Sequence, residues 1–224
     1  MSRRNFLKQT SLASLGILSG PAFASAYDLR FKKDIVIGHG AYRYKVDMNW
    51  GDLNPATTPV KDCHEMVLDS KDRIVLLTNH TKNNVIIYDR SGKYLESWGT
   101  DYPGGHGLTL VKEGGEDFLL ITDYERNQII KTTIDGKVIF EIDYPADIGA
   151  YAAKEEFKPT ETTVLDNGDF YVADGYGNQM ILHYNAKGEL QNFFGGRGTE
   201  EHKFLNAHGI CLDNRDPAAP CLLI

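Results

Sequence analysis

Four segments of the chain share one pattern, and this internal repeat constrains the fold more than any other feature. Each copy begins with a short stretch that contains a polar side chain, passes through a turn and then enters a short apolar run. The copies begin with the stretches CHEMVLD, GHGLTLV, TETTVLD and AHGICLD. They lie about 40 to 55 residues apart, which is the period of a β-propeller blade made of four short strands.

The spacing of the apolar runs gives the boundaries of the copies. Ser-Gly, Asp-Gly and Lys-Gly dipeptides separate the last two runs of the complete copies and predict hairpin turns there. We therefore predict an all-β fold, a β-propeller domain over residues 27–224, with about three and a half blades in this chain. Since propellers close with about four to eight blades, we expect the domain to be truncated at its C-terminus. The predicted copies span residues 62–104, 105–158, 159–205 and 206–224.

The first 26 residues have the pattern of a twin-arginine signal peptide. The stretch SRRNFLK is followed by a weakly apolar run from Leu12 to Leu18 and by small-residue cleavage sites near Ala24 and Ala26. The run is too short to be a permanent membrane anchor. We therefore expect export, with a periplasmic or secreted mature protein.

Charge and cysteine usage exclude several classes of protein. The formal net charge of −7 argues against nucleic acid or an anionic membrane as the main partner, because both attract a basic surface. The 3 cysteines are too few and too irregularly spaced for a disulfide framework. Cys63 and Cys211 lie in predicted first strands, where we expect them to be small buried residues.

The starts of the four copies carry three histidines and one carboxylate at matching positions: His64, His106, Glu161 and His208. Matching positions in repeats face the same way, so we expect these side chains to converge and to bind a divalent metal. Three imidazole ligands would leave a fourth position on zinc for water or substrate. The alternative is that each histidine hydrogen-bonds the backbone of a neighbouring blade. For Glu161 the alternatives to binding the metal are that it orients a histidine ligand or that it faces solvent.

Two further motifs resemble known families. The stretch from Asp123 to Gly136, and more loosely that from Asp174 to Gly188, resembles an NHL repeat. The stretches VADGYGN and FLNAH resemble the lyase domain of peptidylglycine α-amidating enzymes. This resemblance implies a six-bladed propeller with a catalytic zinc held by three histidines at blade starts, and a structural calcium.

Carried over residue by residue, the resemblance makes His106 and His208 the first two zinc ligands, with the third beyond the end of this chain. It makes Tyr176 the catalytic tyrosine, and it gives the calcium backbone oxygens at Met66 and Leu108. The chain also departs from the family. The stretch Asn79-His80-Thr81 has no arginine where the family has a catalytic one, and Gly177 replaces a cysteine. His64 stands where the family has no ligand.

Two functions of different classes remain open. The first is a metal-dependent lyase or hydrolase that acts on a peptide end or a small hydroxylated substrate. The second is a non-catalytic NHL propeller that binds a protein or glycan at its rim. Fold alone cannot separate them, because propellers carry many chemistries. A further aligned histidine in a later blade would favour the enzyme.

Overall fold

The computed structural model describes residues 35–224. The predicted signal peptide, residues 1–26, lies outside the described residues. The chain divides into a unit up to Trp50 and a second unit from Gly51 to Ile224, and each is described by itself. Within residues 35–224, no helix has the length and apolar character needed to cross a membrane.

The described part of the first unit is a hairpin. Strand β1 (Ile35–His39) pairs antiparallel with β2 (Tyr42–Val46). Most side chains of both strands are exposed to solvent. The predicted propeller domain begins at residue 27, whereas the hairpin belongs to the unit that precedes Gly51.

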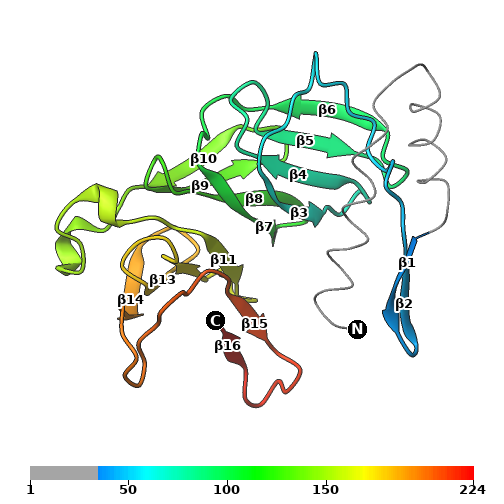
Figure 1. Cartoon of the computed structure of the whole chain (residues 1–224). Coiled ribbons are helices and arrows are strands. Elements are labelled where there is room, and N and C mark those ends of the chain that lie inside the picture. Colours follow the sequence, from blue (N-terminus) through cyan, green and yellow to red (C-terminus); the bar gives the residue numbers. More distant parts are fainter. Residues whose placement is uncertain (1–34) are drawn as a thin grey trace, which may run out of the picture. The chain divides into compact units, whose positions relative to one another are not determined.

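The second unit contains three four-stranded antiparallel sheets and one two-stranded sheet within its described residues 51–224 (Figure 1). The all-β propeller prediction, with three complete blades and part of a fourth, is confirmed. Short 3-10 helices η1 (Ala146–Ile148) and η2 (Lys154–Glu156) lie in the insertion before the third sheet. The strands are β3 (Cys63–Leu68), β4 (Ile74–Thr78), β5 (Val85–Tyr88) and β6 (Tyr94–Trp98); β7 (Gly105–Glu113), β8 (Glu116–Asp123), β9 (Gln128–Thr133) and β10 (Val138–Ile142); β11 (Glu161–Val164), β12 (Phe170–Ala173), β13 (Met180–Tyr184) and β14 (Leu190–Gly195); β15 (Cys211–Asp213) and β16 (Cys221–Leu223).

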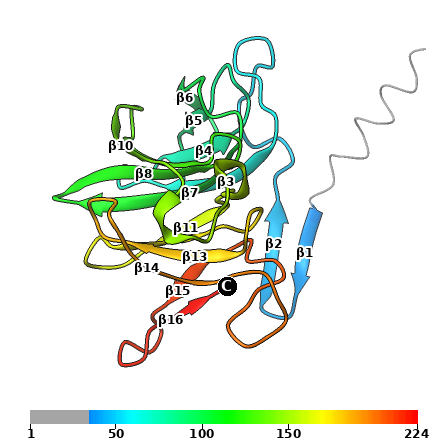
Figure 2. The ribbon, with the colours of Figure 1, turned by 90° about the vertical axis from the view of Figure 1, so that its left-hand side faces the viewer.

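The first strands of successive sheets lie beside one another. Strand β7 contacts both β3 and β11, and β11 contacts β15, so these strands form the inner edge of the blades. In both ribbon views β3, β7 and β11 lie close together (Figures 1 and 2). Side chains at the starts of these strands are therefore brought near one another, although they are far apart in sequence.

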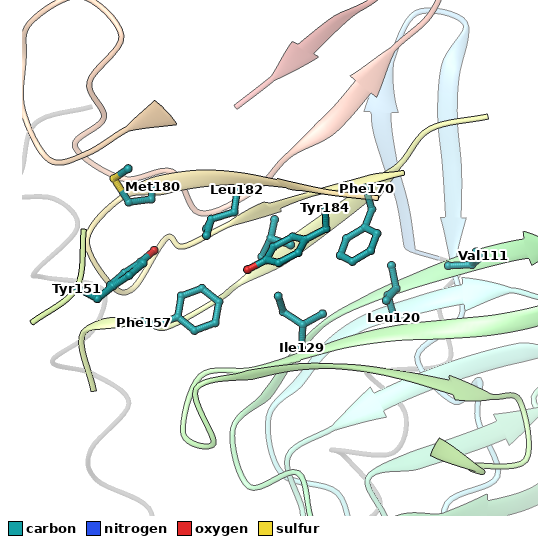
Figure 3. Packing of buried hydrophobic residues seen from close by; sticks show 10 residues of the cluster. Val111, Leu120, Ile129, Tyr151, Phe157, Phe170, Met180, Leu182 and Tyr184 are labelled. Atoms are coloured by element: carbon teal, nitrogen blue, oxygen red, sulfur yellow. The ribbon is translucent and has the colours of Figure 1, made fainter. Parts of the chain in front are cut away.

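The core consists of apolar layers between successive blades. One layer joins β4 and β5 to β7, β8 and β9, and includes Leu77, Ile87 and Ile121. The next joins the second and third blades through residues such as Phe157 and Phe170, which Figure 3 shows facing Ile129 and Leu120. Because each buried side chain of this size contributes roughly 1.5–3 kcal/mol, these interfaces hold the blades together.

The glycines of the three predicted hairpin turns have positive φ angles, whereas two cysteines expected in the core are exposed. Gly92, Gly136 and Gly188 have φ of 88°, 89° and 82°, the left-handed conformation that favours glycine in the predicted turns. The prediction that Cys63 and Cys211 are buried is wrong, since both are exposed. They lie at the N-terminal ends of inner strands, where blade packing does not cover them.

Candidate functional site

Three histidines from three blades meet at the inner edge of the second unit. His64 lies in β3, His106 lies in β7, and His208 lies in the segment just before β15. The ring centroids of His64 and His106 are 4.2 Å apart and the rings are stacked. Those of His106 and His208 are 4.8 Å apart, with an interplanar angle of 73°. His106 is thus the central member of the cluster.

Irregular strand register explains how His64 and His106 reach this position. The pairing of β3 with β4 shifts between Cys63 and Glu65, so His64 lies at a bulge. The pairing of β7 with β8 shifts between Gly105 and Leu108, and this irregularity includes His106. A bulge adds a residue to one strand and redirects its side chain. The register is therefore not equal in every blade, in contrast to the prediction from the repeat.

Glu161 lies in a regular strand and has different partners. It pairs with Ala173 across an unshifted ladder. Its Oε1 accepts hydrogen bonds from Thr162 N at 2.8 Å and Thr109 Oγ1 at 3.4 Å. Burial is the main cause that raises the pKa of Glu161 to about 9. A hydrogen bond with Glu65 and electrostatic repulsion from Glu65 shift it in the same direction. The structure thus groups Glu161 with Glu65 and not directly with the imidazoles.

The two ring nitrogens of His106 have distinct partners. Nδ1 lies 2.9 Å from the carbonyl oxygen of Thr160 in the next blade, so it carries the proton and donates. Burial is the main cause that lowers the pKa of His106 to about 4, and the ring is neutral at neutral pH. Nε2 is therefore unprotonated and presents a lone pair to the cluster. This contact is the backbone bond of the alternative interpretation, and a metal-binding histidine commonly makes such a bond through its other nitrogen.

Tyr176 connects the imidazoles of two blades. Its hydroxyl lies 3.2 Å from Nε2 of His106 and 2.9 Å from Nε2 of His208. The loop that carries Tyr176 follows β12 and is fixed by Asp174, which accepts hydrogen bonds from the backbone N–H groups of Lys158 and Asn178 at 2.6 Å each. The Nε2 atoms of His106 and His208 thus face the same point, where they can also bind a cation or a substrate oxygen together.

Sequence reasoning missed two members of this neighbourhood. The ring centroid of Tyr124 lies 5.5 Å from that of Tyr176 and 6.1 Å from that of His106. Tyr124 follows β8 as Tyr176 follows β12, so the repeat itself contained the signal that could have found it. Glu65 is next to His64 in sequence and interacts with Glu161. No motif distinguished it from an ordinary strand residue.

A metal ion needs several donor atoms that face one point. As the side chains stand in residues 35–224, no group of three or more His, Cys, Asp or Glu residues is arranged to hold one. The donor chemistry nevertheless suits zinc, because His106 is neutral and its Nδ1–H is held by a carbonyl. In the stretch Asn79-His80-Thr81, where the resemblance implied an arginine, Asn79 donates from Nδ2 to Asp62 Oδ2 at 3.0 Å.

Comparison with known proteins finds two groups of relatives. The chain is 40% identical over 111 residues to peptidyl-alpha-hydroxyglycine alpha-amidating lyase 1 of Drosophila melanogaster. The aligned region covers 47% of this chain and 19% of that protein. It is 23% identical over 180 residues to human NHL repeat-containing protein 3, which covers 76% of the chain and 51% of that protein. The chain is similar to both groups.

The likeness extends to solved structures. Virginiamycin B lyase from Staphylococcus aureus matches with a TM-score of 0.52 at 16% identity, over 77% of this chain and 50% of that one. At this identity the match concerns the fold alone, and it agrees with the blades described above. No protein-family model matches the chain. The chain spans about half of the human relative and a smaller part of the fly lyase.

Proposed function

We propose that this chain is part of an exported NHL-type propeller that binds a divalent metal, zinc in the simplest case, and acts as a lyase. The substrate class would be a peptide that ends in α-hydroxyglycine, as in the names of the amidating lyases to which the chain is similar. The observation that carries the proposal is the convergence of His106 and His208, through Nε2, on the hydroxyl of Tyr176.

Each residue of the cluster would have a distinct task. His106 and His208 would be the metal ligands, and His64 would supply a third imidazole from β3. A bound zinc ion would polarise a substrate oxygen and stabilise negative charge on it. The carbonyl of Thr160 fixes the orientation of His106, and burial keeps that ring neutral and able to bind. Tyr176, in its deprotonated form beside the metal, would take a proton from a substrate hydroxyl at its own oxygen.

The proposal also includes Glu161 and a structural calcium ion, for which fewer observations speak. Glu161 would act beside Glu65 near the imidazoles, either as a further metal ligand or as a group that orients a ligand. A structural calcium, held partly by backbone oxygens of Met66 and Leu108, follows only from the resemblance. Both can be decided by the same elemental analysis, which reports calcium and zinc together and can include a Glu161→Gln variant.

Export through the twin-arginine pathway is the second part of the proposal. That pathway carries folded proteins, which suits a metal loaded before export. Replacing both arginines, Arg3→Lys with Arg4→Lys, should stop export, and N-terminal sequencing of the periplasmic protein should begin at Ser25 or Tyr27. An uncleaved N-terminus, or unchanged export of the double variant, would contradict this part.

Two observations favour a second function. The match to NHL repeat-containing protein 3 covers more of this chain than the match to the lyase, and Asn79-His80-Thr81 lacks the family arginine. A non-catalytic propeller that binds a protein or glycan would fit these facts. Such a protein would show neither turnover of a peptidyl-α-hydroxyglycine nor loss of function on removal of metal.

The test is metal content and lyase activity of the purified full-length protein. We expect stoichiometric zinc in the wild type, and loss of most of it in His106→Ala and His208→Ala. His39→Ala is the matched control, because His39 lies in the first unit, and it should retain the metal. Tyr176→Phe should bind zinc yet lose turnover. Equal and negligible metal in all variants would leave the histidines as packing residues.

A further inference from the structure

Gln179 is a buried polar side chain just before β13 that belongs to none of the predicted site residues. Only 2% of it is exposed, and its backbone has a φ of 63°, which is uncommon for a residue other than glycine. A buried amide in a strained backbone conformation needs hydrogen-bond partners to be stable there. The identity of those partners indicates its role.

The partners of Gln179 lie on both sides of the Tyr176–His208 contact. Its Nε2 donates to the carbonyl oxygen of Gly175 at 2.7 Å and, more weakly, to that of Gly177 at 3.4 Å. These two residues flank Tyr176. Its Oε1 accepts a hydrogen bond from the N–H of Ala207 at 2.7 Å, directly before His208. One side chain thus holds the backbone next to both members of the contact.

The two segments that Gln179 joins are also in direct contact. A Cβ atom on Gly175 would lie 2.5 Å from the carbonyl oxygen of Ala207 and 2.7 Å from Cα of His208. Only glycine allows this approach between the third blade and the start of the fourth. Gln179 provides the polar connection across the same gap, where Ala207 is fully buried.

We propose that Gln179 is a positioning residue that sets the distance between Tyr176 and His208 by bonding the backbone beside each of them. Its side-chain bonds place the loop from Asp174 to Gln179 against Ala207. The hydroxyl of Tyr176 then lies within 2.9 Å of His208 Nε2. The consequence for metal binding and turnover rests on the function proposed above, whereas the positioning itself does not.

A matched amide elsewhere in the propeller provides the control. Asn84, which is fully buried, donates from Nδ2 to the carbonyl of Tyr102 at 2.8 Å and accepts the N–H of Tyr102 at 3.0 Å. It therefore connects the first blade to the segment before β7 with the same chemistry. Within residues 35–224 its side chain bonds Thr78, His80 and Tyr102, and neither Tyr176 nor His208. Loss of Asn84 measures the effect of removing an amide between blades as such.

The first measurement uses metal-free full-length protein labelled with 13C in its histidine and tyrosine rings. Gln179→Met keeps the length of the side chain and removes its amide. We expect the ring signals of His208 and Tyr176 to shift in this variant and to stay in place in Asn84→Leu. The signal of His39 is an internal reference. Unchanged His208 and Tyr176 signals in Gln179→Met, or equal shifts in both variants, would overturn the proposal.

A second variant covers the case in which Gln179→Met does not fold. Gln179→Glu keeps an acceptor for Ala207 N–H but removes the donor to the loop, so the Tyr176 signal should shift more than that of His208. The reverse order would contradict the proposal.

A metal-binding measurement separates this inference from the proposed function. If the metal site exists, Gln179→Met should raise the zinc dissociation constant about 10- to 100-fold, as loss of residues that orient ligands commonly does, and Asn84→Leu should not. An unchanged dissociation constant in Gln179→Met would overturn the effect on binding. A wild type that binds no zinc would refute the proposed function, while the ring signals would still decide the role of Gln179.

Discussion

Strands β7 and β11 hold matching places in neighbouring blades, yet they direct their first side chains differently. Strand β7 is irregular at His106, which turns toward His64 and His208. Strand β11 is regular at Glu161, which instead bonds Thr109 and Thr162. The position of a residue in a repeat therefore does not by itself determine where its side chain points. One extra residue in a strand changes which side chains meet.

Burial shifts the pKa values of His106 and Glu161 in opposite directions. Burial lowers the pKa of His106 to about 4 and raises that of Glu161 to about 9, since in each case the charged form is disfavoured. Both side chains are therefore held largely neutral near pH 7 in the metal-free fold. A neutral imidazole can bind a metal, whereas a protonated carboxyl cannot do so without losing its proton.

The largest expected effect comes from removing the space that the β7 irregularity needs. A Cβ on Gly107 would lie 2.5 Å from the carbonyl oxygen of Thr160 and 2.9 Å from Cα of Glu161, both backbone atoms. Gly107→Ala should therefore lower the free energy of unfolding by about 1–3 kcal/mol, as overpacking does, and separate β7 from β11. Chemical denaturation measures this change.

The control for that variant is Lys112→Ala, an exposed change on the same strand. It should alter the free energy of unfolding by less than about 0.5 kcal/mol. Equal stability of Gly107→Ala and the wild type would mean that β7 and β11 do not approach closely at this point.

The stability of the metal-free protein should depend on pH, with opposite signs for the two blades. The pKa of Glu161 rises from 4.5 to about 9 on folding, so stability is lost as pH rises through this window. The pKa of His106 falls from 6.5 to about 4, so stability is lost as pH falls through that range. Glu161→Gln should flatten the alkaline slope of unfolding free energy, and His106→Asn the acidic slope.

Unfolding curves of the wild type and both variants from pH 4 to pH 9 check these signs. If Glu161→Gln keeps the full alkaline slope, the carboxyl is ionised in the fold and its contact with Glu65 is not as described. If His106→Asn keeps the full acidic slope, another group produces it.

The smallest expected effect is the loss of the hydroxyl that connects two blades. Tyr176 is 45% exposed, so Tyr176→Phe should cost no more than about 0.5–1.5 kcal/mol, the usual net value of a hydrogen bond. Thermal unfolding measures the change. Tyr94→Phe is a control, because it removes another tyrosine hydroxyl, one that bonds Ser97 within the first blade. A much larger loss for Tyr176→Phe would assign the hydroxyl a structural role.

Much of the fold could be predicted from local pattern. The apolar runs and Gly-containing turns gave every strand of the three complete sheets, because strand alternation and turn chemistry are local properties. The sequence pattern also selected His64, His106, His208 and Tyr176, which the structure brings together. It overestimated burial at Cys63, because strand membership does not reveal what covers a strand end.

The sequence by itself determined the blade pattern and the side chains available at the inner edge. The tertiary structure alone decided which of them meet. Bulges at His64 and His106 and a regular register at Glu161 arise from the pairing of whole strands, and no local residue preference specifies them. The bonds of Gln179 to Gly175 and Ala207 likewise depend on packing between two blades. Such contacts join residues distant in sequence, so only the assembled sheets fix their geometry.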